Sequence, residues 1–198
     1  MAKIDLGKII PRWEWRTFGE SFGTAETNIG KYECTRVKES SEVYIISKMG
    51  GNNTKIRDML MDIKLLETIN TDKLEQWMPV MKSSFPVATE DISEVFKAAN
   101  IKTPDYKREK YTYDQFLDEL INNHPDLKAV GVFKKRYGYM IDEAIVEIAD
   151  LQINGTSIKT AAVEHENPQL VIDTVRKLEL DQFENINYIT GIKQVVGW

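Results

Sequence analysis

The sequence has few of the residues on which several common chemistries depend. Its 198 residues include one cysteine, Cys34, and two histidines. A single cysteine excludes an internal disulfide and a zinc site built from cysteine thiolates, and it favours a reducing, cytoplasmic setting. Cys34 has no histidine near it in sequence. His124 precedes Pro125 at an expected helix end and His165 alternates away from its acidic neighbours, so neither is expected to act as a catalytic base.

Long apolar runs and an excess of positive charge are also missing. No run approaches the roughly 20 apolar residues that span a bilayer, and the start MAKIDLGKIIPRW lacks a signal peptide's apolar core, so we expect no membrane contact and no processing. The net charge of -5 argues against nucleic-acid binding through bulk charge. Any anion site would need a local concentration of Lys and Arg. The length suits one domain, and the sequence carries no indication of the oligomeric state.

The most regular pattern runs from Leu127 to Glu166. Its β-branched and aromatic residues alternate with charged residues at the period of two that a strand requires, and they predict three consecutive strands. The dipeptide Asn154-Gly155 is a strong hairpin signal between the last two strands. A solvated face is the ordinary explanation for one such hairpin. The charged residues that share strand faces are Lys134, Arg136, Glu147, Glu164 and Glu166.

The same alternation of charges recurs in the first third of the chain. RWEWRTF predicts a first strand whose two tryptophans lie on one side and whose charged residues lie on the other. Two more alternating runs follow a Gly-Gly-Asn-Asn turn at 50–53, with a turn or bulge expected at 59–61 between them. The charged residues on these faces are Arg12, Glu14, Arg16, Lys55, Arg57, Asp62 and Lys64.

Helical patterns occupy the middle and the end of the chain. Leu74, Trp77, Met78 and Met81 recur at helical spacing and predict a helix over 70–82, in which we interpret the Met and Trp stripe as packing. The remaining expectations are a helix near 89–99, a polar loop over 102–111, a short helix ending before Pro125, a helix from Asn167-Pro168 and a C-terminal strand or packed extension.

Closure of the sheet into a barrel would bring the charged strand faces into one cavity. Unpaired charge in a cavity is costly, and an anionic ligand together with a cation would relieve it. Lys and Arg bind phosphate oxygens, Arg through its bidentate fork. Clustered carboxylates hold Mg²⁺ or Mn²⁺, which take oxygen ligands and bridge phosphates. The pattern therefore favours a tunnel for a metal-bound polyphosphate.

The ordered motifs TKIRD, MDIKLLE, VFKKRYGY, AIVEIADL and AAVEHE resemble those of the CYTH superfamily, also called triphosphate tunnel metalloenzymes. The resemblance covers most of the chain. It implies an α+β fold, an antiparallel eight-stranded β-barrel with helices packed outside. It also implies a single domain, residues 1–198, with a helical insertion at about 70–125. Family members use Mg²⁺ or Mn²⁺ to hydrolyse or cyclise nucleotides, thiamine triphosphate or inorganic tripolyphosphate.

The resemblance also implies roles for individual residues. Catalytic carboxylates would be Glu14, Glu164 and Glu166, and these with Glu147 would hold Mg²⁺ or Mn²⁺. The residues implied to bind the substrate phosphates are Arg12, Arg16, Lys55, Arg57, Lys64, Lys134 and Arg136. The chain departs from the family at its first strand, where Arg12 stands in place of the first Glu of the ExExK pattern.

Three classes of function stay open at this point. A metal-dependent triphosphatase comes first, with a small-molecule triphosphate or polyphosphate as partner. The alternatives are a non-catalytic binder of polyphosphate or nucleotide, which Arg12 favours, and an adenylate-cyclase-like activity. A β-rich interaction domain with solvated charges is the third class. The most informative observation is whether the charged residues line one enclosed cavity.

Overall fold

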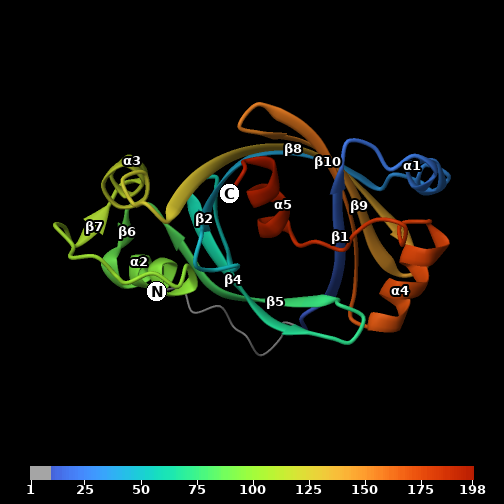
Figure 1. The fold of residues 1–198 in the computed structure, drawn as a ribbon, viewed down its shortest axis with the longest axis horizontal. Coiled ribbons are helices and arrows are strands. Elements are labelled where there is room, and N and C mark those ends of the chain that lie inside the picture. Colours follow the sequence, from blue (N-terminus) through green and yellow to red (C-terminus); the bar gives the residue numbers. More distant parts are fainter. Residues whose placement is uncertain (1–9) are drawn as a thin grey trace.

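Eight antiparallel strands form a closed ring in the computed structural model, which describes residues 10–198 (Figure 1). The order around the ring is β1-β10-β9-β8-β2-β3-β4-β5, and β5 returns to β1. The predicted α+β fold with an eight-stranded barrel is therefore confirmed, whereas the expectation about the first residues lies outside the described part. The strands are β1 (Trp13–Gly19), β2 (Arg36–Ser47), β3 (Asn53–Arg57), β4 (Leu60–Ile69), β5 (Glu75–Ser84), β8 (Leu127–Ile141), β9 (Ala144–Ile153) and β10 (Thr156–His165).

Tight turns join the strands that are neighbours in sequence. The predicted turn at Asn154-Gly155 is confirmed, and both residues have the positive φ that a two-residue hairpin of this type requires. Asp142 and Glu143 turn between β8 and β9 with φ of 48° and 69°. The β3–β4 turn uses 58–59, one residue earlier than expected.

Strand β5 corrects the prediction of a helix over 70–82. The helical spacing of Trp77 and Met81 is real, but β5 pairs with β4 along its length and with β1 at its start. Pro79 has no backbone N–H to donate within a helix, and in the sheet it sits next to a register shift in the pairing with β4. Closure of the ring thus outweighs the local pattern, and the helical segment begins only after β5.

A helical lobe follows β5 and packs on the outside of the ring (Figure 1). Its buried residues meet the outward side chains of β2, β3, β4 and β5, such as Ile45 and Met61. The predicted helix near 89–99 is confirmed, whereas the predicted polar loop ends in a short strand. The elements are β6 (Val87–Ala88), α2 (Thr89–Ala98), β7 (Lys110–Tyr111) and α3 (Tyr113–Phe116), which continues as a π-helical turn (Leu117–Ile121).

Helices α1 (Thr24–Ile29) and α4 (Pro168–Lys177) cover another part of the outer face. They pack against Trp15 and the outward residues of β9 and β10, so the tryptophan side of β1 is buried as predicted. The side chain of Asn167 accepts a hydrogen bond from the backbone of Gln169 at the start of α4, which is the predicted helix. Within residues 10–198, no helix is long and apolar enough to cross a bilayer.

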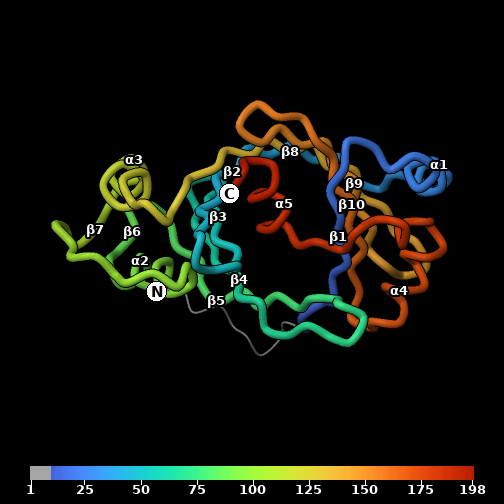
Figure 2. The backbone as a smooth tube through the Cα atoms, viewed as in Figure 1, coloured from blue at the N-terminus to red at the C-terminus, as the bar shows by residue number. Residues whose placement is uncertain are grey.

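The C-terminal helix α5 (Tyr188–Val195) lies inside the outline of the ring (Figures 1 and 2). This part of the chain was expected to be a strand or a packed extension, and it is a helix whose first turn is capped by the Asn187 side chain. Its buried residues pack on inward-facing apolar side chains of β2, β8 and β9. Helix α5 therefore covers the apolar part of the inner face of the ring.

Candidate active site

A polar cavity of about 170 Å³ lies inside the ring, next to α5. Eight of the predicted site residues line it, and they come from six strands because each strand turns alternate residues inward. These eight are Glu14, Arg16, Lys55, Lys64, Lys134, Arg136, Glu147 and Glu164. Within the described part of the chain, five cations thus face three carboxylates in one small space.

The acidic corner of the cavity is built from β1 and β10. Glu14 and Glu164 are directly opposite each other in the strand register. Arg16 donates a hydrogen bond of 2.7 Å from Nε to Glu14 Oε1, and its Nη2 lies 4.0 Å from Glu164 Oε1. Burial and the neighbouring Glu14 charge raise the pKa of Glu164 to about 7. Burial alone would also raise the pKa of Glu14, but the charge and hydrogen bond of Arg16 hold it below its usual value.

Glu42 contacts the cations Lys134 and Arg57 behind the cavity wall. The sequence analysis did not identify it as a site residue. Its side chain is 1% exposed and accepts contacts from Lys134 Nζ at 2.9 Å and Arg57 Nη1 at 3.3 Å. The Tyr44 hydroxyl also donates to it at 2.8 Å. Burial alone would raise the pKa of Glu42, but the charges of Lys134 and Lys55 lower it to about 2. Glu42 is therefore a fixed anion that holds the cations in place.

Lys134 and Arg16 are the two deeply buried cations of the cavity, and Lys134 has the closest aromatic neighbours. Its Nζ donates to the Tyr44 hydroxyl at 2.6 Å and lies 4.0 Å from the centroid of the Tyr188 ring. Burial lowers its pKa to about 7, and the charges of Lys55 and Arg16 act in the same direction against the opposing Glu42 charge. An anion in the cavity would restore the charged form of Lys134.

Four further lining residues were missed by the sequence analysis. They are Tyr44, Asn53, Trp77 and Tyr188. Trp77 was interpreted as helix packing, and its place on the cavity wall corrects that interpretation. Tyr188 lies on α5, and no local pattern tells which space a helix enters. Three of the lining residues also carry a buried polar atom without a hydrogen-bond partner, and these atoms are Asn53 Oδ1, Arg136 Nε and the Tyr188 hydroxyl.

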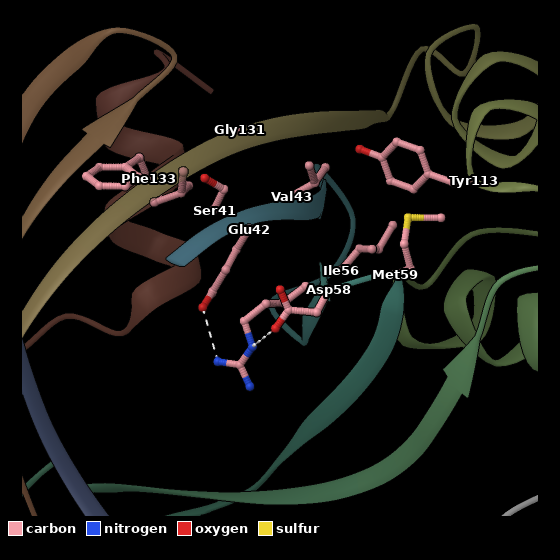
Figure 3. Close-up of a pocket in the computed structure, with 11 residues that line it drawn as sticks. Ser41, Glu42, Val43, Ile56, Asp58, Met59, Tyr113, Gly131 and Phe133 are labelled. Atoms are coloured by element: carbon pink, nitrogen blue, oxygen red, sulfur yellow. Dashed lines mark hydrogen bonds and ion pairs between the residues drawn. The ribbon is translucent and has the colours of Figure 1, made fainter. Parts of the chain in front are cut away.

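Three of the predicted site residues lie elsewhere. Arg12 is exposed and lines an adjoining hollow together with Glu14, Lys64 and Glu164. Glu166 is exposed just beyond the end of β10 and is absent from the cavity wall. Arg57 reaches Glu42, and its Nε lies 3.9 Å from Asp58 (Figure 3).

Arg57 also lines a separate hollow of about 390 Å³. Figure 3 shows the residues around this hollow, which come from the middle of β2, from β8, from the β3–β4 turn and from Tyr113 of α3. Its wall is mostly apolar, and among the residues on it Phe133 and Met59 are more than one-third exposed. The hollow holds none of the five cations of the tunnel cavity.

The donor set suits a hard divalent cation that shares its ligands with a phosphate chain. Glu14 and Glu164 face each other, and their mutual repulsion, seen in the raised pKa of Glu164, would be relieved by a cation between them. Among residues 10–198, no group of three or more acidic, His or Cys side chains is arranged as a complete metal site. Mg²⁺ commonly binds through one or two carboxylates, with waters and substrate phosphates as its other ligands, so the residues present fit it.

Solved structures share this fold. A putative adenylyl cyclase from Hippeastrum, described as having a dominant triphosphatase activity, matches with a TM-score of 0.51 at 7% identity over 92% of this chain and 95% of that chain. A putative adenylate cyclase from Bacillus halodurans matches with a TM-score of 0.51 at 11% identity over 92% and 98%. No family model and no curated protein sequence matches the chain. These matches show a fold that known proteins share.

Proposed function

We propose that the protein is a metal-dependent phosphohydrolase that binds the phosphate chain of a triphosphate in the ring. The observation that carries the proposal is the gathering of Arg16, Lys55, Lys64, Lys134 and Arg136 with three carboxylates in one cavity. Arg136 and Tyr188 both line the cavity, and each carries a buried donor that has no partner among the described residues. Inorganic tripolyphosphate and nucleoside or thiamine triphosphates share this chemistry.

The cations supply the main catalytic contribution in this proposal. In a loose phosphoryl-transfer transition state, the protein positions the chain and neutralises charge, and no protein nucleophile is required. Arg16 on β1 and Lys134 on β8 enter the cavity from different strands, and both would bind the phosphates. Glu42 keeps the basic wall in position.

Glu14 and Glu164 would hold Mg²⁺ or Mn²⁺, with Glu147 assisting from β9. When bound, the metal would neutralise negative charge on the phosphate oxygens. Arg16 bonds to Glu14 and approaches Glu164, so it orients both carboxylates toward the cavity. At neutral pH Glu164 is near its pKa, and binding of the cation would release its proton.

A non-catalytic binder is the second candidate, and Arg12 favours it. Arg12 lines the same hollow as Glu14 and Glu164, where a further carboxylate would complete the ExExK pattern of the CYTH superfamily. Its positive charge lies close to the proposed metal ligands. The protein would then hold a triphosphate and leave it intact.

Phosphate release from tripolyphosphate and from ATP, with Mg²⁺ or Mn²⁺, tests the proposal. We expect the wild type to release phosphate or pyrophosphate and Glu164→Gln to abolish the release, because the amide keeps the size and removes the charge. The melting temperature shows that the variant is folded. Arg12→Glu is expected to keep or increase the activity.

Glu94→Gln is the matched control, because Glu94 lies on α2, away from the ring interior. It should release phosphate at the wild-type rate. A wild type that binds triphosphate but releases no product would favour the binder. If Glu164→Gln were as active as the wild type, the assignment of the acidic corner would be wrong.

A further inference from the structure

The cavity continues into a second hollow of about 150 Å³. The two spaces share Glu14, Lys64, Trp77 and Glu164 as lining residues. A ligand that places its phosphates among the cations of the cavity can therefore extend into this hollow. None of the described residues lines both the cavity and the larger hollow of about 390 Å³, so the larger hollow offers no such extension.

The smaller hollow lies where β5 separates from β1. In the described part of the chain, two residue pairs join these strands, and both lie at the strand starts. Residues 10–12, which precede β1, form one wall of the hollow, and Trp77 and Pro79 of β5 form another. Gln76 Nε2 donates a hydrogen bond of 3.0 Å to the Pro11 carbonyl, so the first wall is tied to β5.

Trp77 presents a large aromatic ring to this space and is only half-buried. Its Nε1 donates a hydrogen bond of 3.2 Å to Glu75 Oε2, and Glu75 Oε1 accepts a hydrogen bond of 3.0 Å from Asn187 Nδ2. These contacts hold the indole in one orientation before any ligand binds. A ligand ring that covers the indole would gain both apolar burial and stacking.

The residues next to Trp77 in the hollow are also apolar. Ile10 is 65% exposed, and Pro11 and Pro79 lie on the same lining. A phosphate chain alone has no apolar surface with which to cover these side chains. A triphosphate that carries an organic ring has such a surface, and small-molecule sites commonly combine an apolar wall with a few placed charges.

We propose that this hollow binds the aromatic head group of an organic triphosphate, with the ring stacked on Trp77 and the phosphates in the cavity. The inference rests on the proposed function and narrows the substrate to a triphosphate that carries a flat ring. Every nucleobase has a face that can stack on an aromatic side chain. Nucleoside triphosphates and thiamine triphosphate therefore share the required chemistry, and Trp77 is a specificity-determining residue outside the charged motifs.

Titration of ATP and of tripolyphosphate, each with Mg²⁺, tests the role of the ring. The quantity compared is the Kd for ATP divided by the Kd for tripolyphosphate, because changes in the contacts to the shared phosphates cancel in this ratio. Trp77→Leu should raise the ratio about 10-fold or more, as expected for loss of one stacked base. Trp77→Phe should raise it much less, because both variants lose the hydrogen bond to Glu75 but phenylalanine keeps a ring.

Two additions make the test independent of one variant and of one head group. Ile10→Ser, at an exposed position that precedes β1, leaves the strands intact and should raise the same ratio by removing part of the apolar surface. Thiamine triphosphate is titrated in the same way, and the ring compound with the larger Trp77 effect is the better match to the hollow. Melting temperatures show that each variant is folded.

Phe133→Leu is the matched control, because Phe133 is an exposed aromatic residue on the wall of the separate, larger hollow. It should leave the ratio at the wild-type value. A ratio raised by Phe133→Leu and not by Trp77→Leu would place the head group in the larger hollow and overturn the proposal. Equal ratios for the wild type and Trp77→Leu would also overturn it, whereas the proposed function would stand. If the wild type binds neither ligand, both are overturned.

Discussion

Lys134 shows how single residues set the electrostatics of this cavity. It shares the Glu42 carboxylate with Arg57 and lies within the field of Lys55 and Arg16. A buried ion pair contributes little net stability, but removal of one partner leaves an uncompensated charge and costs about 3–5 kcal/mol. The positive charges around Glu42 are therefore only partly neutralised in the ligand-free protein, and a bound anion would neutralise them further.

The pKa of Lys134 predicts how phosphate binding depends on pH. Its pKa is about 7 in the ligand-free protein, so Lys134 is mostly charged at pH 6 and mostly neutral at pH 9. A bound phosphate raises this pKa, so binding takes up a proton above pH 7. Titration at several pH values should show that Lys134→Met weakens tripolyphosphate binding about 10-fold or more at pH 6 and progressively less as pH rises.

The Kd of Lys134→Met is divided by the Kd of the wild type at each pH. This ratio cancels the effect of tripolyphosphate's own protonation, which is the same for both proteins. Lys97→Met is the control, because Lys97 is exposed on α2. It should leave the Kd unchanged at every pH. A ratio for Lys134→Met that stays constant from pH 6 to 9 would contradict the lowered pKa.

At the level of elements, α5 depends on close packing against β1. Gly191 is buried in α5, and a Cβ at this position would overlap the Phe18 ring. Only glycine lets the helix approach β1 closely enough for Tyr188 to reach the cavity. The requirement at position 191 is therefore the absence of a side chain.

Gly191→Ala tests this packing. Alanine in a helix is normally more favourable than glycine by about 1 kcal/mol. Here the overlap with Phe18 should instead lower the free energy of unfolding by about 1–3 kcal/mol, the usual cost of overpacking. Urea denaturation measures the change. Thr190→Ala, at an exposed position of the same helix, should stay within about 0.5 kcal/mol of the wild type. A Gly191→Ala protein as stable as the wild type would contradict the packing.

For the whole molecule, much of the ring could be predicted from the sequence. Charged residues alternate with other residues along β8, and this alternation predicted that Lys134 and Arg136 share one face of the strand. Both residues line the cavity. The register of distant strands then brought Glu14 opposite Glu164. The order of the motifs supplied the fold, because the same alternation alone is equally typical of a solvated sheet.

The rest depended on contacts that no local pattern contains. Trp77 and its neighbours have helical spacing, and only pairing with β4 and β1 makes that segment a strand. Glu42 pairs with Arg57 and Lys134 on other strands, and nothing in the local sequence around Glu42 indicates these partners. Tyr188 enters the cavity because α5 packs across apolar ends of strands that are far from it in the chain.

The central claim is that the ring interior binds a triphosphate, and calorimetric titration of tripolyphosphate with Mg²⁺ tests it most directly. We predict that the wild type binds below millimolar concentration and that Arg136→Ala raises the Kd about 10- to 100-fold, because one charge-assisted hydrogen bond is worth roughly 1.5–3 kcal/mol. Arg108→Ala, which removes an exposed cation of the helical lobe, should bind as the wild type does. Absence of binding by the wild type at millimolar ligand, or equal Kd values for the two variants, would contradict the account.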